Sequence, residues 1–75
     1  MPVATQVARD IEADINAGRC APDTRLPSEA DLSQQYGIAR MTVRRAVAQL
    51  RDKGLVVTVH GRGSFVAPHE DQTQG

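Results

Sequence analysis

Two arginines four residues apart, Arg40 and Arg44, are the side chains in this sequence best suited to recognising a ligand. Residues four apart on a helix share one flank, so both guanidinium groups can reach the same surface. Each guanidinium is a planar fork of donors that matches the two acceptor atoms on the major-groove edge of guanine. The pair therefore indicates a surface that reads double-stranded DNA. The alternative interpretation is a solvated basic face with incidental salt bridges.

Other polar residues near this pair are candidates for contacts with the DNA backbone. Thr42 and Arg45 lie off the flank of the two arginines and are better placed for phosphates. Ser28 and Glu29 begin an earlier helix, whose N-terminal amides form a natural anion site. Ser28 is also expected to cap that helix, and the cap is the more secure of its two roles. Arg25 either contacts the DNA backbone or pairs with a nearby acid.

A third group of candidates lies in the sequence His60-Gly61-Arg62-Gly63. Glycines allow the backbone to lie close against a sugar-phosphate wall, and an arginine between them can enter a narrow minor groove. A tight hairpin turn would favour glycine for its own reasons. We expect all four residues to contact DNA, with Arg62 as the principal side chain.

These residues need a scaffold, and the first part of it is an amphipathic helix near the N-terminus. Val3, Val7, Ile11 and Ile15 recur every four residues and predict one apolar stripe over about four turns, which ends at Gly18. The following residues 19–27 contain two prolines and are expected to form an ordered loop.

Two further helices are predicted around a tight turn at Gly37. Ser28 and Asp31 form a variant capping box at the start of the second helix, and Gly37 ends it where a positive φ is needed. A third helix is expected from Ala39 or Arg40 to Lys53. The residues expected to face inward are Leu32, Tyr36, Ile38, Val43, Ala46, Val47 and Leu50. A generic helical pair has similar periodicity, but small Ser33 four residues before the glycine favours a helix-turn-helix.

The pattern after Gly54 changes from helical to alternating, which predicts a hairpin. Leu55, Val57 and Val59 should face one way and Val56 and Thr58 the other, with a return strand at residues 64–66. The predicted fold is mainly α with a small β-hairpin, a winged helix-turn-helix of three helices plus a wing over residues 3–67. The polar residues 68–75 are expected to be a disordered tail.

Charge in this 75-residue chain is strongly segregated, although the formal net charge is zero. Residues 1–39 hold three basic and six acidic side chains, whereas residues 40–67 hold six basic and one acidic. A basic half is typical of a protein that binds a polyanion, and the total charge conceals it.

Other classes of function find little support in the sequence. Cys20 is the single cysteine, so no internal disulfide can form, and it is expected to be a small loop or core residue. Cys20, His60 and His69 lack the spacing of metal ligands, and no catalytic arrangement or phosphate loop is present. We therefore expect no enzyme activity, no metal and no cofactor. No signal peptide or long apolar run is found, which predicts a cytoplasmic protein without a membrane partner.

The segments RLPSEADLSQQYGIARMTVRRAVAQL and GRGSFV together resemble the DNA-binding domain of the GntR family of bacterial transcription regulators. The run RMTVR is most similar to the HutC branch. This resemblance implies that Arg40 and Arg44 contact bases and that Thr42 holds the backbone. It also implies that Gly61 and Gly63 approach the minor groove, and that two copies bind a palindromic operator, most often as a repressor.

The chain departs from the family pattern in three respects. Ala39 stands where members usually carry Ser or Thr, so the third helix loses an N-cap worth about 0.5–2 kcal/mol. Ala30 replaces a frequent basic residue, which weakens an anchor on DNA. Members usually continue into a C-terminal domain that binds a small effector and forms the dimer, so no effector site is expected within this chain. An excised domain and a minimal regulator both remain open, as does a winged-helix module that binds protein instead of DNA.

Overall fold

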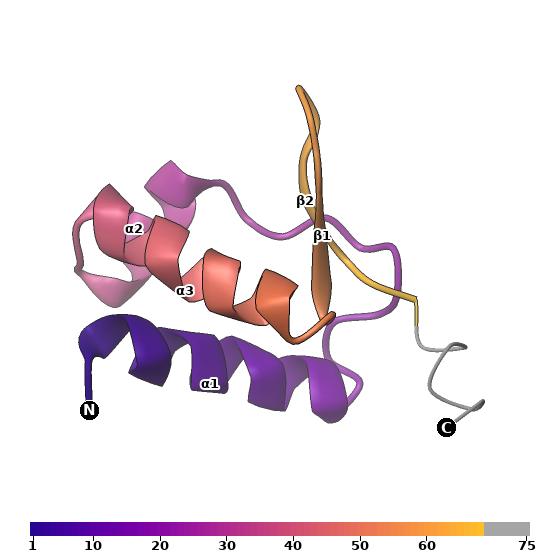
Figure 1. The fold of residues 1–75 in the computed structure, drawn as a ribbon, viewed down its shortest axis with the longest axis horizontal. Helices are drawn as coiled ribbons and strands as arrows, with labels where there is room; N and C mark the ends of the chain where they lie inside the picture. Colours follow the sequence, from indigo (N-terminus) through magenta and orange to yellow (C-terminus); the bar gives the residue numbers. More distant parts are fainter. Residues whose placement is uncertain (69–75) are drawn as a thin grey trace.

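A computed structural model describes residues 1–68 of the protein, and most of the tail expected at residues 68–75 lies outside the described residues. Three helices are followed by a two-stranded hairpin, which confirms the predicted mainly α fold (Figure 1). Their bounds are α1 Val3–Asn16, α2 Glu29–Tyr36, α3 Arg40–Asp52, β1 Val56–Val59 and β2 Gly63–Val66. Within residues 1–68, no helix is both long enough and apolar enough to span a membrane.

The turn between α2 and α3 is held by local hydrogen bonds. Ser28 caps α2 by accepting a hydrogen bond from the backbone N–H of Asp31 at 3.1 Å. Gly37 ends the helix with φ of 66°, as expected for a left-handed cap. Ser33 then donates its hydroxyl to the carbonyl of Ile38, and its own carbonyl accepts from the N–H of Ile38 at 3.1 Å. Ser33 is therefore part of the turn itself, besides allowing the helices to approach.

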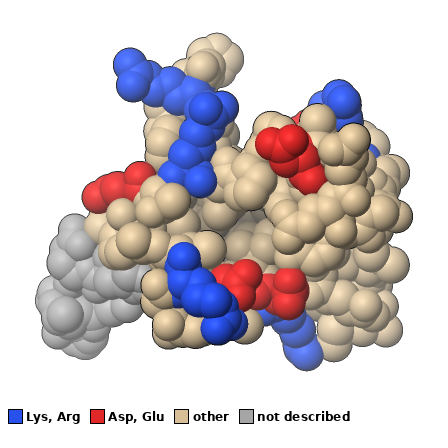
Figure 2. Space-filling model, turned by 180° about the vertical axis from the view of Figure 1, so that it is seen from behind, with Lys and Arg blue, Asp and Glu red and all other residues tan. Residues whose placement is uncertain are grey.

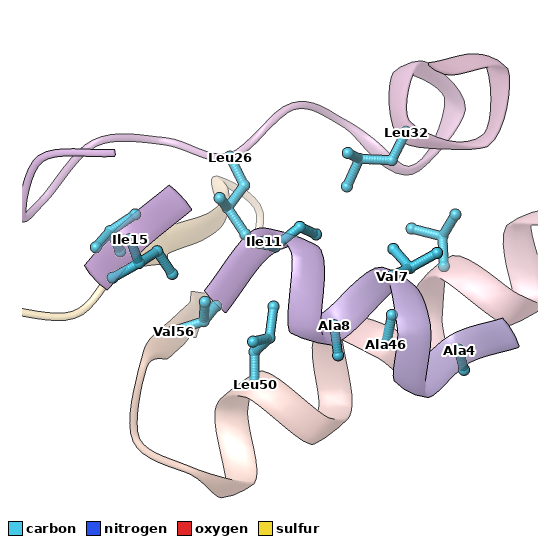
Figure 3. Packing of buried hydrophobic residues seen from close by; sticks show 12 residues of the cluster. Ala4, Val7, Ala8, Ile11, Ile15, Leu26, Leu32, Ala46, Leu50 and Val56 are labelled. Atoms are coloured by element: carbon cyan, nitrogen blue, oxygen red, sulfur yellow. The ribbon is translucent and has the colours of Figure 1, made fainter. Parts of the chain in front are cut away.

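The core lies between α1 and α3, which run side by side with their apolar stripes facing each other (Figures 1 and 3). Leu50 and Val43 of α3 are fully buried, together with Val56 and Val66 at the base of the hairpin. Cys20 packs against this cluster and is partly buried, as predicted. The helical positions expected to be buried are buried or half-buried, apart from Val3.

The prediction for Val3 was wrong, because it is 49% exposed although it belongs to the predicted stripe. It is the first residue of α1, and Ala4 takes the buried position there. The apolar face at this end of α1 is therefore made by small side chains, which let α1 and α3 lie close together.

The hairpin pairs in antiparallel register, with Val57 opposite Phe65 and Thr58 opposite Ser64. The loop before α2 joins its edge: the N–H of Leu26 donates to Ser64 and the N–H of Val66 to Thr24, both at 2.8 Å. The loop of residues 19–27 is thus ordered, as predicted, by pairing with β2.

The expected alternation along β1 does not give two contrasting faces. Val56 is buried, but Val57 and Val59 are 45% and 41% exposed and Thr58 is exposed as well. The reason is that the hairpin projects beyond the helices, so neither face of its outer half is packed against another element (Figure 1). We call residues 56–66 the wing.

Candidate nucleic-acid interface

A groove of about 630 Å³ opens between the helix pair and the wing. Figure 2 shows basic side chains along the projecting wing and a hollow between the wing and the helices. Four arginines line this groove, three from α3 and one from the loop before α2: Arg40, Arg44, Arg51 and Arg25. We call it the arginine groove. Glu29 also lines the groove and is the single acid in its lining.

Arg44 is held in place by Glu29 across the helix pair. Its Nε donates to Oε2 of Glu29 at 2.8 Å, and its Nη1 lies 3.7 Å from the sulfur of Met41. The hydrogen bond and the negative charge of Glu29 raise the pKa of the Arg44 guanidinium. Glu29 engages Nε, and the side chains of Arg44 and Glu29 are 60% and 42% exposed.

Arg40 is the first residue of α3 and is exposed in the same groove. The structure therefore brings Arg40 and Arg44 to one flank, which is the arrangement predicted from their spacing. Thr42 and Arg45 line a separate shallow hollow beside the N-terminal end of α1. The recognition helix α3 thus presents two flanks, one toward the wing and one toward α1.

The N-terminus of α3 lacks a side-chain cap, as expected from Ala39. Ala39 has an extended backbone conformation (φ −68°, ψ 151°), which is the geometry of an N-cap residue, but its side chain has no oxygen that could accept a hydrogen bond from the first N–H groups of α3. The amides at the start of α3 are consequently left to other acceptors.

The tip of the wing is shaped by its glycines. Gly61 has φ of 78° and Gly63 φ of 111°, and the N–H of Arg62 donates to Val59 at 2.9 Å to close the turn. A Cβ at Gly61 would meet no atom within 4 Å, so the backbone there is open to solvent. His60 and Arg62 are both exposed at this tip.

Two further arginines that line the groove were not predicted, or not settled, from sequence. Arg51 was not among the predicted contacts, although the spacing 40, 44, 47, 51 places it on the flank of Arg40 and Arg44. Arg25 could have paired with an acid, but within residues 1–68 no carboxylate lies within salt-bridge distance of its guanidinium. Its side chain instead lies against Gly63, where a Cβ would come within 3.1 Å of its Nε.

The remaining titratable feature lies on the far side of α2. Tyr36 donates its hydroxyl to Asp10 of α1. Partial burial, and then the hydrogen bond and negative charge of Asp10, raise the pKa of Tyr36 above its ordinary value. This bond ties α2 to α1 at a distance from the arginine groove. Within the described residues, no three His, Cys, Asp or Glu side chains are gathered closely enough to hold a metal ion.

Three helices, a projecting wing and a basic groove between them define a winged helix-turn-helix DNA-binding domain. The family model for "Bacterial regulatory proteins, gntR family" matches residues 3–66, and the chain belongs to this family. The resemblance found in the sequence motifs is therefore confirmed.

Individual relatives agree with this assignment. The chain is 40% identical over 67 residues to the HTH-type transcriptional repressor NagR of Bacillus subtilis, covering 89% of this chain and 28% of NagR. It is 42% identical over 72 residues to the histidine utilization repressor of Klebsiella aerogenes, covering 96% of this chain and 30% of that repressor. These relatives are transcriptional repressors and not enzymes, and the chain spans about three tenths of their length.

Solved structures give the same result. The structure of the AraR DBD in complex with operator ORR3 matches with a TM-score of 0.85 and 42% identity, covering 89% of this chain and 81% of that one. A GntR family transcriptional regulator from Listeria monocytogenes matches with a TM-score of 0.89 at 23% identity, over 99% of this chain and 65% of that one. The second likeness bears on the fold alone.

Proposed function

We propose that this chain reads a specific double-stranded DNA operator on behalf of a GntR-family transcription repressor. The observation that carries the proposal is the convergence of Arg40 and Arg44 on one flank of α3, at the mouth of a groove whose other wall is the wing. The N-terminal half of a recognition helix is the part that enters the major groove. The guanidinium groups of two arginines at that position match the pair of hydrogen-bond acceptors on the major-groove edge of guanine.

Each remaining residue has a role that follows from its place. Arg40 and Arg44 contact base edges, and Thr42 and Arg45 on the α1 side contact phosphates of the strand lying there. Ser28 and Glu29 at the start of α2 lie at the edge of the same surface, where the free amides of α2 receive a phosphate. The wing tip enters the adjacent minor groove through His60, Gly61, Arg62 and Gly63.

For the biological unit, membership of the GntR family supports the following arrangement. Residues 3–67 form the DNA-binding domain and the polar residues 68–75 a tail. Two copies bind the halves of a palindromic operator and can contact each other on the DNA, and repression results from occupancy of that site. The domain carries out no catalysis, uses no cofactor and contains no effector site of its own. As a regulator of chromosomal genes it works in the cytoplasm, at the nucleoid.

A docking module that binds protein is the alternative for this fold. DNA is favoured over it by the four arginines of the arginine groove and by the structural relatives at 42% identity, which are AraR domains in complex with operators. A docking module also has no need of arginines on both flanks of α3. The two functions differ in one property, because only the DNA-binding domain should bind duplexes with a steep dependence on salt.

The test compares two neighbouring arginines. A duplex is first selected from a random pool with the unmodified chain, and binding is then measured by fluorescence anisotropy against a scrambled duplex. Arg44→Ala should weaken binding to the selected duplex by about 5- to 150-fold and reduce discrimination, because a base contact is lost. Arg45→Ala should weaken both duplexes equally, because a phosphate contact carries no sequence information. Unchanged discrimination in Arg44→Ala would refute the assigned roles.

A further inference from the structure

The wall of the arginine groove formed by the wing brings together Arg51, which was not predicted as a contact, and Arg25, whose role the sequence left open. Arg51 ends the exposed flank of α3, and its Nη1 donates to the hydroxyl of Thr58 at 3.1 Å. The hydroxyl of Thr58 lies 3.3 Å from that of Ser64, its partner across the hairpin. Arg25 reaches the same wall from the loop and lies against Gly63. Two guanidinium groups and two hydroxyls thus line one side of the groove.

This wall is rigidly built. The backbone of Arg25 forms a β-bridge with Phe65. The residues before and after it, Thr24 and Leu26, form backbone hydrogen bonds with β2, and these bonds hold Arg25 at the edge of the hairpin. Glycine is favoured at position 63 by its φ of 111° and also by the space available. A Cβ at this position would lie 3.1 Å from Nε of Arg25 and 3.4 Å from Nη2 of Arg25. The absence of a side chain at Gly63 is what makes room for the Arg25 guanidinium.

In the part of the chain that the structure describes, the positive charges of Arg25 and Arg51 are not balanced by a nearby carboxylate, in contrast to those of three other basic residues. Arg19, Arg44 and Lys53 each have a carboxylate at 2.8–2.9 Å. Over residues 1–68, neither Arg25 nor Arg51 has a carboxylate within salt-bridge distance, and the acid in the groove lining, Glu29, is already bound to Arg44. Their positive charges are therefore available to an anion.

We propose that Arg25, Arg51, Thr58 and Ser64 form a binding site for a backbone phosphate of double-stranded DNA. The inference rests on the proposed function, in which α3 occupies a major groove and the wing the next minor groove. One sugar-phosphate strand separates these two grooves, so it must pass between α3 and the wing. The arginine groove is the space that lies there. Guanidinium forks and hydroxyls are the common donors to phosphate oxygens.

The site fixes the position of the domain along the DNA, but it does not distinguish one base sequence from another. It holds the strand between the base-reading flank and the wing, so that Arg40 and Arg62 enter neighbouring grooves together. Each phosphate neutralised by a basic side chain adds about 0.9 to the slope of log affinity against log salt. Because both arginines bind the same phosphate, the site corresponds to a change of about 0.9 in slope and about 8-fold in affinity near 0.1 M salt.

The experiment removes both charges and compares the result with the loss of two charges elsewhere. Arg25→Gln/Arg51→Gln is measured by anisotropy across a salt series on the selected and scrambled duplexes. The control is Arg9→Gln/Arg19→Gln, which changes the net charge equally at exposed positions outside the groove. The groove variant should lose about 0.9 in slope on both duplexes with discrimination unchanged, whereas the control keeps the slope. Arg25→Lys/Arg51→Lys should restore the slope, and circular dichroism checks that every variant is folded.

A second experiment removes the negative charge of individual DNA phosphates. Each phosphate of the selected duplex is replaced in turn by a neutral methylphosphonate. One position should weaken binding of the unmodified chain and have no effect on Arg25→Gln/Arg51→Gln. The absence of such a position, or a slope in the groove variant equal to that of the control, would overturn the phosphate site while leaving the proposed function intact. Failure of the unmodified chain to bind any duplex would instead refute the proposed function itself.

Discussion

Replacing Leu50 by alanine tests how firmly the recognition helix is held by the rest of the domain. Leu50 is fully buried on α3 and packs among α1 and the base of the wing (Figure 3). Leu→Ala removes three carbon atoms, worth about 0.8 kcal/mol each in transfer free energy, and leaves a cavity that adds to the loss. We expect the free energy of unfolding to fall by about 3–5 kcal/mol. A domain of this size has about 4–11 kcal/mol in total, so the melting temperature should fall by at least about 12 °C.

The assay is thermal and urea denaturation followed by circular dichroism, with Val57→Ala as the matched control. Val57 is a large apolar side chain too, but it is 45% exposed on the wing. Its truncation should change the free energy of unfolding by less than about 0.5 kcal/mol. A loss below about 1 kcal/mol for Leu50→Ala would refute the packing of α3 against α1. A Val57→Ala loss as large as that of Leu50→Ala would show that the outer face of the wing is covered in solution.

Three further predictions follow from particular residues. Ala39→Ser should raise the free energy of unfolding by about 0.5–2 kcal/mol in urea titrations, because it supplies the missing cap of α3, and no gain would contradict the cap geometry. Tyr36 is the only tyrosine and the chain has no tryptophan, so ultraviolet absorbance reports its ionisation directly. Its pKa is raised in the folded protein, so the stability it contributes is present below about pH 10 and is lost as the pH rises through the higher folded value. Tyrosinate should therefore form at higher pH in the native than in the urea-unfolded chain, and Asp10→Asn should narrow the gap; equal midpoints would exclude the raised pKa. Glu29→Gln should release Arg44, tighten binding to scrambled duplexes and lower discrimination in anisotropy, and unchanged discrimination would count against a positioning role for Glu29.

Much of the scaffold is predictable because its determinants are local. The four-residue period of α1, the cap at Ser28 and the left-handed turn at Gly37 act on neighbouring residues, and each helix bound lies within a few residues of the prediction. The flank shared by Arg40 and Arg44 follows from helix geometry alone. The placement of both side chains along one groove was therefore predictable from the sequence.

The remaining features depend on contacts between distant parts of the chain. Alternation along β1 shows which side chains share a face, but not whether another element covers that face, so the exposure of Val57 was not predictable. Arg25 joins the wing through a bridge to Phe65, forty residues later in the sequence. The salt bridge between Arg44 and Glu29 likewise joins two different helices, α3 and α2. A single sequence contains no direct signal for such pairings.

Whether this domain reads a DNA sequence is decided by the affinity of the unmodified chain for the selected and scrambled duplexes across a salt series. Fluorescence anisotropy should show tighter binding to the selected duplex and a steep loss of affinity for both as salt rises, because several arginines neutralise phosphates while Arg40 and Arg44 read bases. No binding to either duplex at low salt would refute DNA recognition by this chain and would assign the winged helix to protein recognition.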